Sequence, residues 1–262
     1  MVYSLWLLGL GLLFVLLERI WPRTTQSVFR RGIWSDIAYI VFNSEYLGVL
    51  LGMASIHVIA VVDRALNLAG LREYFYMGVV SGRPLWLQIL LLLTLFDFAQ
   101  WCIHNLLHRV PVLWEFHKVH HSIVELDWIG NWRFHWFEIV VYKTLLYPVA
   151  AFFGFSGIAM FWYGIVNTLV GHFAHANLHV RIGPLKYLVN SPEMHIWHHT
   201  HPDSGPMDRN FGITLAVWDW LFGTAYVPVR HDPERLGFAG IERYPANILG
   251  QIAAPFWRRS GA

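Results

Sequence analysis

The sequence has very little cysteine and few charged residues, and each shortage excludes a class of protein. The single cysteine among 262 residues, Cys102, rules out an internal disulfide and a cysteine-rich zinc or iron–sulfur site. Charged residues make up only 14% of the chain, against roughly 25% in a typical soluble domain. A formal net charge of +2 is too small to indicate a nucleic-acid partner. Together with 56% hydrophobic residues, these shortages indicate an integral membrane protein.

Four apolar stretches predict the membrane helices, and they cover residues 2–17, 37–62, 85–103 and 139–171. The first stretch lacks the basic start and the small-residue cleavage site of a signal peptide, so we expect a retained helix. The fourth is interrupted by Pro148 and by the segment 154–157, which predicts a hairpin that enters the bilayer and returns. The sequence therefore predicts an all-α integral membrane helical bundle with about four spans, one of them a broken hairpin.

The charges and the chain order also predict orientation and domains. Arg23, Arg30 and Arg31 follow the first stretch and favour a cytoplasmic loop there, with the later polar segments also cytosolic. We expect N-terminal membrane helices and an outer loop over 1–85, a catalytic domain over 86–230 and a tail over 231–262. The final residues 257–262 carry no endoplasmic-reticulum retrieval signal, which favours a bacterial inner membrane over the endoplasmic reticulum of a eukaryote.

Fifteen histidines are unexpected in so apolar a chain. They concentrate in two HxxxH and two HxxHH motifs, which alternate along the sequence. Residues three and four apart share one face of a helix, so the imidazoles of each motif converge. Helices that face one another could then hold two metal ions. The ten candidate ligands are His104, His108, His117, His120, His121, His175, His179, His195, His198 and His199.

An all-imidazole site suits iron, zinc, copper or nickel. A ligating ring is neutral, and its second nitrogen needs a hydrogen-bond acceptor. Polar residues near the motifs supply candidates for that role: Asp97, Glu138, Asn177, Asn210 and Asp219. Glu45 lies inside the second apolar stretch and is a further candidate for a functional role.

Two other classes of protein remain open at this point. A b-type haem protein needs only one or two axial histidines, so the adjacent triplets would be superfluous. A non-enzymatic membrane metal-binding or transport protein would place its ligands near the bilayer midplane, whereas these motifs lie just outside the apolar stretches.

Beyond the histidines, several segments between about residues 90 and 226 resemble the fatty acid hydroxylase/sterol desaturase superfamily. Asn105 and Trp136 depart from that pattern, at positions where many members carry Arg and Pro. The segments that carry the resemblance are Asp97 to His104, Leu113 to Ser122, Arg133 to Glu138, Asn210 to Gly212 and Leu215 to Thr224.

The resemblance implies a four-helix-type membrane domain with a cytosolic, histidine-rich catalytic cap. It implies two metal ions, normally iron, with O2 as co-substrate; zinc could replace iron in purified protein. It also implies hydroxylation or desaturation of a lipid, such as a sterol, fatty acyl chain, ether lipid, carotenoid or hopanoid. No electron-transfer domain is attached, so we expect a separate donor, namely a ferredoxin, a cytochrome b5-like protein or a reductase. His135 and His172 are additional candidates, either as ligands or as residues beside them.

Overall fold

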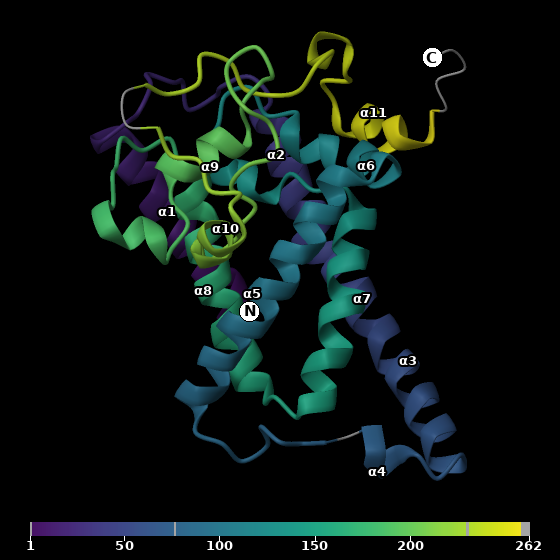
Figure 1. Ribbon diagram of the computed structural model, residues 1–262. Coiled ribbons are helices and arrows are strands. Elements are labelled where there is room, and N and C mark those ends of the chain that lie inside the picture. Colours follow the sequence, from purple (N-terminus) through teal and green to yellow (C-terminus); the bar gives the residue numbers. More distant parts are fainter. Residues whose placement is uncertain (1, 76, 229–230, 258–262) are drawn as a thin grey trace.

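The computed structural model describes residues 2–75, 77–228 and 231–257, and this part of the chain is helical, with isolated β-bridges and no strand. Long helices form the lower part of the molecule in Figure 1, and shorter helices and loops form a cap above them. The α-helices are α1 (Val2–Ile20), α2 (Ile33–Ile40), α3 (Gly48–Leu68), α4 (Arg72–Phe75), α5 (Leu85–Arg109), α6 (Pro111–His121), α7 (Trp136–Phe153), α8 (Gly157–His175), α9 (Pro192–His198), α10 (Val217–Phe222) and α11 (Ile248–Ala253).

Three helical segments of the described chain are long and apolar enough to cross a membrane. The first runs without interruption over Ile33–Leu68 and joins α2 to α3 through the π-helical segment η1 (Val41–Leu47). The other two are α5 and α7. The first predicted stretch forms α1, which is not among these three.

The predicted hairpin consists of α7 and α8. Gly154 ends α7 with a φ of 77°, a left-handed conformation that favours glycine, and the chain then reverses. Ser156 caps α8 by accepting a hydrogen bond from the Ala159 amide. Pro148 lies inside α7 and does not end it, so the turn alone separates the two arms.

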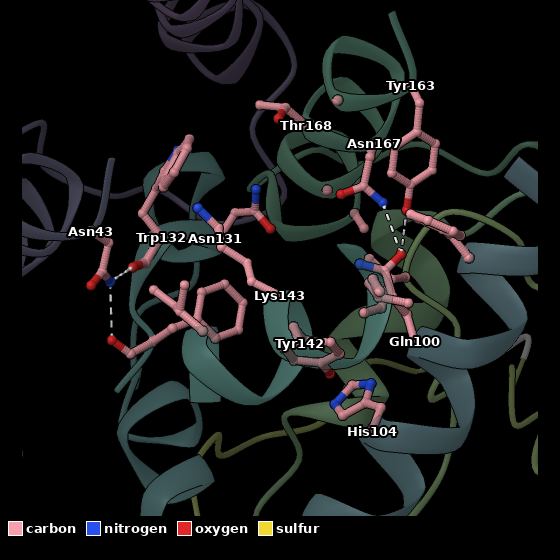
Figure 2. Close-up of a pocket in the computed structure, with 18 of the residues that line it drawn as sticks. Asn43, Gln100, His104, Asn131, Trp132, Tyr142, Lys143, Tyr163, Asn167 and Thr168 are labelled. Carbon is pink, nitrogen blue, oxygen red and sulfur yellow. Dashed lines mark hydrogen bonds between the residues drawn. The ribbon is translucent and has the colours of Figure 1, made fainter. Parts of the chain in front are cut away.

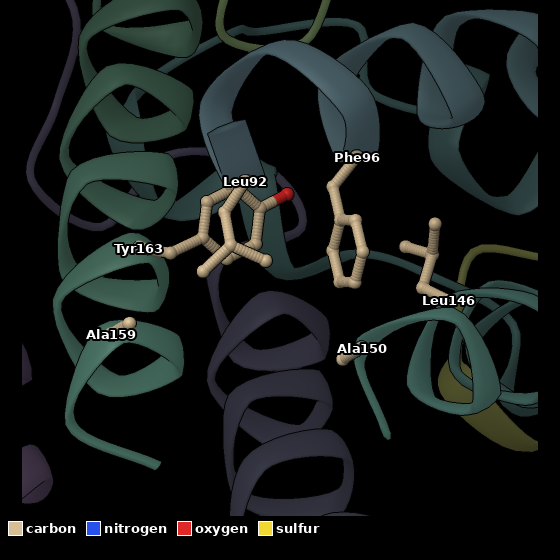
Figure 3. Packing of buried hydrophobic residues seen from close by; sticks show 6 residues of the cluster. All are labelled: Leu92, Phe96, Leu146, Ala150, Ala159 and Tyr163. Carbon is tan, nitrogen blue, oxygen red and sulfur yellow. The ribbon is translucent and has the colours of Figure 1, made fainter. Parts of the chain in front are cut away.

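The apolar core of the bundle lies where α5 meets this hairpin. Figure 3 shows Leu92 and Phe96 of α5 packed between the two arms. The ring of Phe96 meets that of Tyr163 edge-on, with the centroids 5.6 Å apart. This packing fixes the position of α5, whose last turns carry the first HxxxH motif.

The cap is joined to the membrane helices by buried charges and by α1. Arg30 hydrogen-bonds the carboxylates of Asp36 and Asp127, and Arg133 binds Asp36 as well. Arg30 is therefore a buried ion-pair partner, and not one of the free loop cations from which the sequence predicted a cytoplasmic loop. At the end of α1, the carboxylate of Glu18 accepts hydrogen bonds from the amides of cap residues.

Three further sequence predictions concern the end of the third apolar stretch, Glu45 and the C-terminal tail. The third apolar stretch continues as helix to Arg109, so the first two histidines lie on the spanning helix itself and not after it. The side chain of Glu45 and residues 258–262 of the tail lie outside the described part of the chain.

Candidate metal centre

The structure brings nine of the ten candidate histidines into two adjacent groups, which lie where the cap meets the ends of α5 and α8. Within each group, one ring nitrogen per residue lies within 4.8 Å of all the others. Nearly all of these side chains are buried. The first group consists of His104, His108, His117, His121 and His198, and the second of His120, His175, His195 and His199.

Each HxxHH motif divides its three rings between the two groups. In α6 the pair His117 and His121 enters the first group, while His120 enters the second. In the motif of α9, His195 and His199 enter the second group, while His198 enters the first. Residues four apart lie on one helix face and the residue between them lies beside it. Each motif thus contributes to both groups, whereas its spacing predicted that its three rings would converge at one point.

In five pairs of neighbouring rings, two within the first group and three within the second, the Nε2 atoms lie 3.0 to 3.2 Å apart. In six of the nine rings, Nδ1 faces an oxygen that can only accept, so Nδ1 carries the proton. The Nε2 atoms of these six rings then carry a free lone pair, and five of the six face the Nε2 of a neighbouring ring. Two nitrogens about 2.1 Å from one cation and at right angles are about 3.0 Å apart. The spacing and the tautomers therefore fit bound metal ions.

Burial favours the neutral form of five of these rings. It lowers the pKa of His120, His121, His195 and His199 well below the ordinary histidine value, and neighbouring imidazoles add to the effect. It lowers the pKa of His198 to about 3, and the Nε2 of His198 is buried without a hydrogen-bond partner. Neutral rings with free lone pairs are the form in which histidine binds metal.

The partners of the Nδ1 atoms are two carboxylates and four backbone carbonyls, and they lie between 4 and 107 residues from the rings they hold. Glu138, at the start of α7, holds His117 at 3.0 Å, as the sequence analysis suggested for a residue of this kind. Asp208 holds His108 at 3.0 Å, and the sequence analysis did not identify it. Backbone carbonyls hold the other four rings, and these carbonyls belong to Phe211, Arg133, Gly171 and Arg209.

The other polar candidates act on the backbone around the site and do not contact a histidine of either group. Asp97 accepts hydrogen bonds from the amides of Thr214 and Leu215 and from the indole of Trp218. Asn210, with a φ of 55°, bridges the backbone of Met194 and Tyr226. Asn177 binds Thr24 in the loop after α1.

The structure does not bring His179 to either group. α8 ends at His175 and the next residue is extended, so His179 does not continue the helix face, and its side chain is exposed. A spacing of four residues brings two side chains together only when one helix contains both, and no helix contains both His175 and His179. His135 and His172 are buried outside the groups: His135 bonds the carbonyl of Ile252, and His172 packs against Trp128.

Glu138→Ala is expected to weaken metal retention by roughly 10- to 100-fold, because the carboxylate that orients His117 is lost. Glu138→Gln should lose less, since a carboxamide oxygen still accepts a hydrogen bond from Nδ1. Titrating each purified variant with a chelator and measuring the metal that remains checks this. Equal retention in Glu138→Ala and the wild type would contradict it.

Asp219→Asn is expected to lower stability by about 1–3 kcal/mol, since one oxygen acceptor becomes a donor facing buried N–H groups. Asp219 accepts hydrogen bonds from the Trp101 indole and from the amides of Phe211 and Gly212, whose loop supplies the carbonyl that holds His104. Denaturation in detergent measures the change. Asp203→Asn is the control, because Asp203 is exposed and should change stability by less than about 0.5 kcal/mol.

A cavity of about 460 Å³ leads from the histidines into the membrane domain between η1, α5, α7 and α8. Five histidines lie at its wall, and the remaining lining is mostly apolar and aromatic. Figure 2 shows Gln100 accepting hydrogen bonds from Tyr163 and Asn167, which places carboxamide and hydroxyl groups on this wall. The histidines at the wall are His104, His117, His120, His175 and His195.

The fold and the site define a helical membrane protein with a buried, histidine-rich centre that opens into an apolar cavity. A family model described as fatty acid hydroxylase matches residues 89–224, slightly more than half of the chain. This protein therefore belongs to the fatty acid hydroxylase family.

Known proteins that resemble the chain include an ornithine lipid hydroxylase of Rhizobium tropici, 28% identical over 94% of this chain and 73% of that protein. An alkylglycerol monooxygenase of Xenopus tropicalis is 29% identical over 50% of this chain, and that of Homo sapiens is 28% identical over 49%. The chain spans less than a third of each alkylglycerol monooxygenase. No solved structure matches the chain significantly.

Proposed function

We propose that this protein oxidises a C–H bond of a membrane lipid with O2, as a non-haem di-iron hydroxylase or desaturase. The observation that carries the proposal is the convergence of nine buried imidazoles, with their Nε2 atoms about 3 Å apart, at the wall of an apolar cavity. Relatives named as lipid hydroxylases and monooxygenases, together with the family match, support it.

The two groups of histidines would hold the two ions, five ligands on one and four on the other. When bound, such iron ions supply the activation of O2 and the removal of hydrogen from an unactivated carbon. The ligand set follows the geometry, so His179, His135 and His172 are left out of it. Two electrons would come from a separate donor protein, and the cap would face the cytoplasm of a bacterial inner membrane.

The protein's own residues bind, orient and exclude water. Glu138, Asp208 and four carbonyls keep the ligating rings in one tautomer and one orientation. The cavity wall, formed by residues such as Phe96, Leu146 and Ile213, presents an apolar surface to the substrate. A mostly apolar cavity of this kind favours a lipid over a polar metabolite.

Lipid profiling of cells with and without the gene tests the proposal. We expect a lipid in the expressing cells that has gained one oxygen atom or lost two hydrogen atoms. Isotopically labelled O2 should label the hydroxylated product. Identical lipid profiles in both strains, with the protein present in the membrane and loaded with metal, would contradict the proposal.

A further inference from the structure

Lys143 is a charged residue in an apolar segment, and neither the metal centre nor the fold explains it. It lies in the middle of α7, which is one of the three candidate spans. An ionisable side chain at such a position is costly and is usually retained for a function. Figure 2 shows the Lys143 side chain extending into the cavity that leads to the histidines.

The ammonium group of Lys143 has no anionic partner among the described side chains. Its Nζ lies 5.8 Å from the centroid of the Tyr147 ring, a weak cation–ring contact. On the same cavity wall, Asn43 uses its Nδ2 to bind the carbonyls of Trp132 and Phe134, while its Oδ1 is buried without a partner. The cavity therefore offers one cation and one unused acceptor that a ligand can satisfy.

An apolar groove joins the cavity at the same lysine. This groove, of about 520 Å³, lies between α3 and α7, where α3 diverges from the bundle in Figure 1. Lys143 and Tyr147 line both the groove and the cavity. The other groove residues are apolar apart from Thr144, and they run from Leu51 to Leu66 along α3, about 22 Å of helix. A lipid chain matches a groove of this composition and length.

We propose that the substrate is a lipid with an anionic group, a carboxylate or a phosphate, which Lys143 binds at the junction while the acyl chain occupies the α3–α7 groove. The inference rests on the proposed function and makes it more specific by naming a substrate class and a specificity-determining residue. Glu138, which holds His117, lies five residues before Lys143, about 7.5 Å along α7. The residue that binds the anionic group is thus roughly one and a half helical turns from Glu138, the carboxylate that holds His117.

The test measures binding, so it does not depend on turnover. Full-length, metal-loaded protein in nanodiscs of phosphatidylcholine is titrated with palmitate, hexadecyl phosphate and hexadecanol, which share one chain and differ in the polar end. We expect one or both anions to bind about 10- to 100-fold more tightly than the alcohol, the range for a charge-assisted hydrogen bond. The tighter of the two anions identifies the group as carboxylate or phosphate.

Three variants assign the preference to Lys143. Lys143→Met should abolish the preference for anions and leave hexadecanol binding unchanged, whereas Lys143→Arg should retain it. Lys186→Met is the matched control, because Lys186 makes the same kind of contact with Tyr187, at 5.6 Å, outside the cavity. Lys186→Met should behave as the wild type. All four proteins should hold the same amount of metal.

A groove variant tests the second part of the proposal. Ala151 lines the groove and its side chain is exposed, so Ala151→Trp fills the space without disturbing a packed core. We expect weaker palmitate binding and unchanged octanoate binding, since only the longer chain reaches that depth. Equal binding of palmitate to this variant and the wild type would place the chain elsewhere.

Two results would overturn the role of Lys143. One is equal affinity of the wild type for palmitate, hexadecyl phosphate and hexadecanol. The other is an equal loss of affinity for anions and alcohol in Lys143→Met. Anion-selective binding that depends on Lys143, without any lipid oxidation, would instead contradict the proposed function and leave Lys143 as the residue that binds the anionic group of a lipid.

Discussion

His120→Ala and His198→Ala are each expected to abolish lipid oxidation and to lower the metal content of the purified protein. The two residues belong to different groups, so each variant tests one metal position. Removal of a ligand should cost more than the roughly 10- to 100-fold that loss of an outer hydrogen-bond partner costs. Elemental analysis of the protein and product formation in membranes are measured on the same preparations.

His179→Ala is the matched control for both variants. It removes a histidine of an HxxxH motif that the structure leaves exposed and outside both groups. We expect it to keep its metal and its activity. If His179→Ala lost metal while His120→Ala or His198→Ala kept full activity, the ligand assignment derived from the structure would be refuted.

Removal of the metal by a chelator is expected to lower the apparent melting temperature by roughly 10 °C. The physical reason is that the buried Nε2 lone pairs, 3.0 to 3.2 Å apart, repel one another when no cation lies between them. Metal at about a thousand times its dissociation constant contributes about 4 kcal/mol, which corresponds to that shift for a chain of this size.

Refilling the chelated protein separates structure from chemistry. Fe2+ should restore both the melting temperature and lipid oxidation, whereas Zn2+ should restore only the melting temperature, because zinc has no redox chemistry. An unchanged melting temperature after complete removal of the metal would show that the histidines do not depend on a cation.

The helical histidine motifs explain why so much of the centre was predictable. Spacings of three and four residues place side chains on one helix face whatever surrounds the helix, so the motifs of α5, α6 and α9 predicted metal ligands. Glu138 was predictable as an acceptor because it follows a histidine-rich segment within the family-like sequence. Asp208 was not, because it lies 100 residues from His108 and no local pattern connects them.

Sequence motifs gave wrong predictions where the end of a helix or the packing of a loop decides which side chains reach the histidines. The spacing of His175 and His179 matches that of His104 and His108, but α8 ends at His175 and the second residue leaves the site. Asp97 and Asp219 looked like partners of the histidines because they precede or follow them in the sequence. They instead accept hydrogen bonds from loop amides, and Asp219 thereby positions Phe211, whose carbonyl holds His104.

By itself, the sequence determined that this protein is a helical membrane protein whose histidines gather on shared helix faces, since hydropathy and helical period are local properties of the chain. Only the tertiary structure decided how each HxxHH motif divides between two groups and that Lys143 lies where the groove meets the cavity. Those features depend on which helices face one another, and that depends on contacts between segments far apart in the chain.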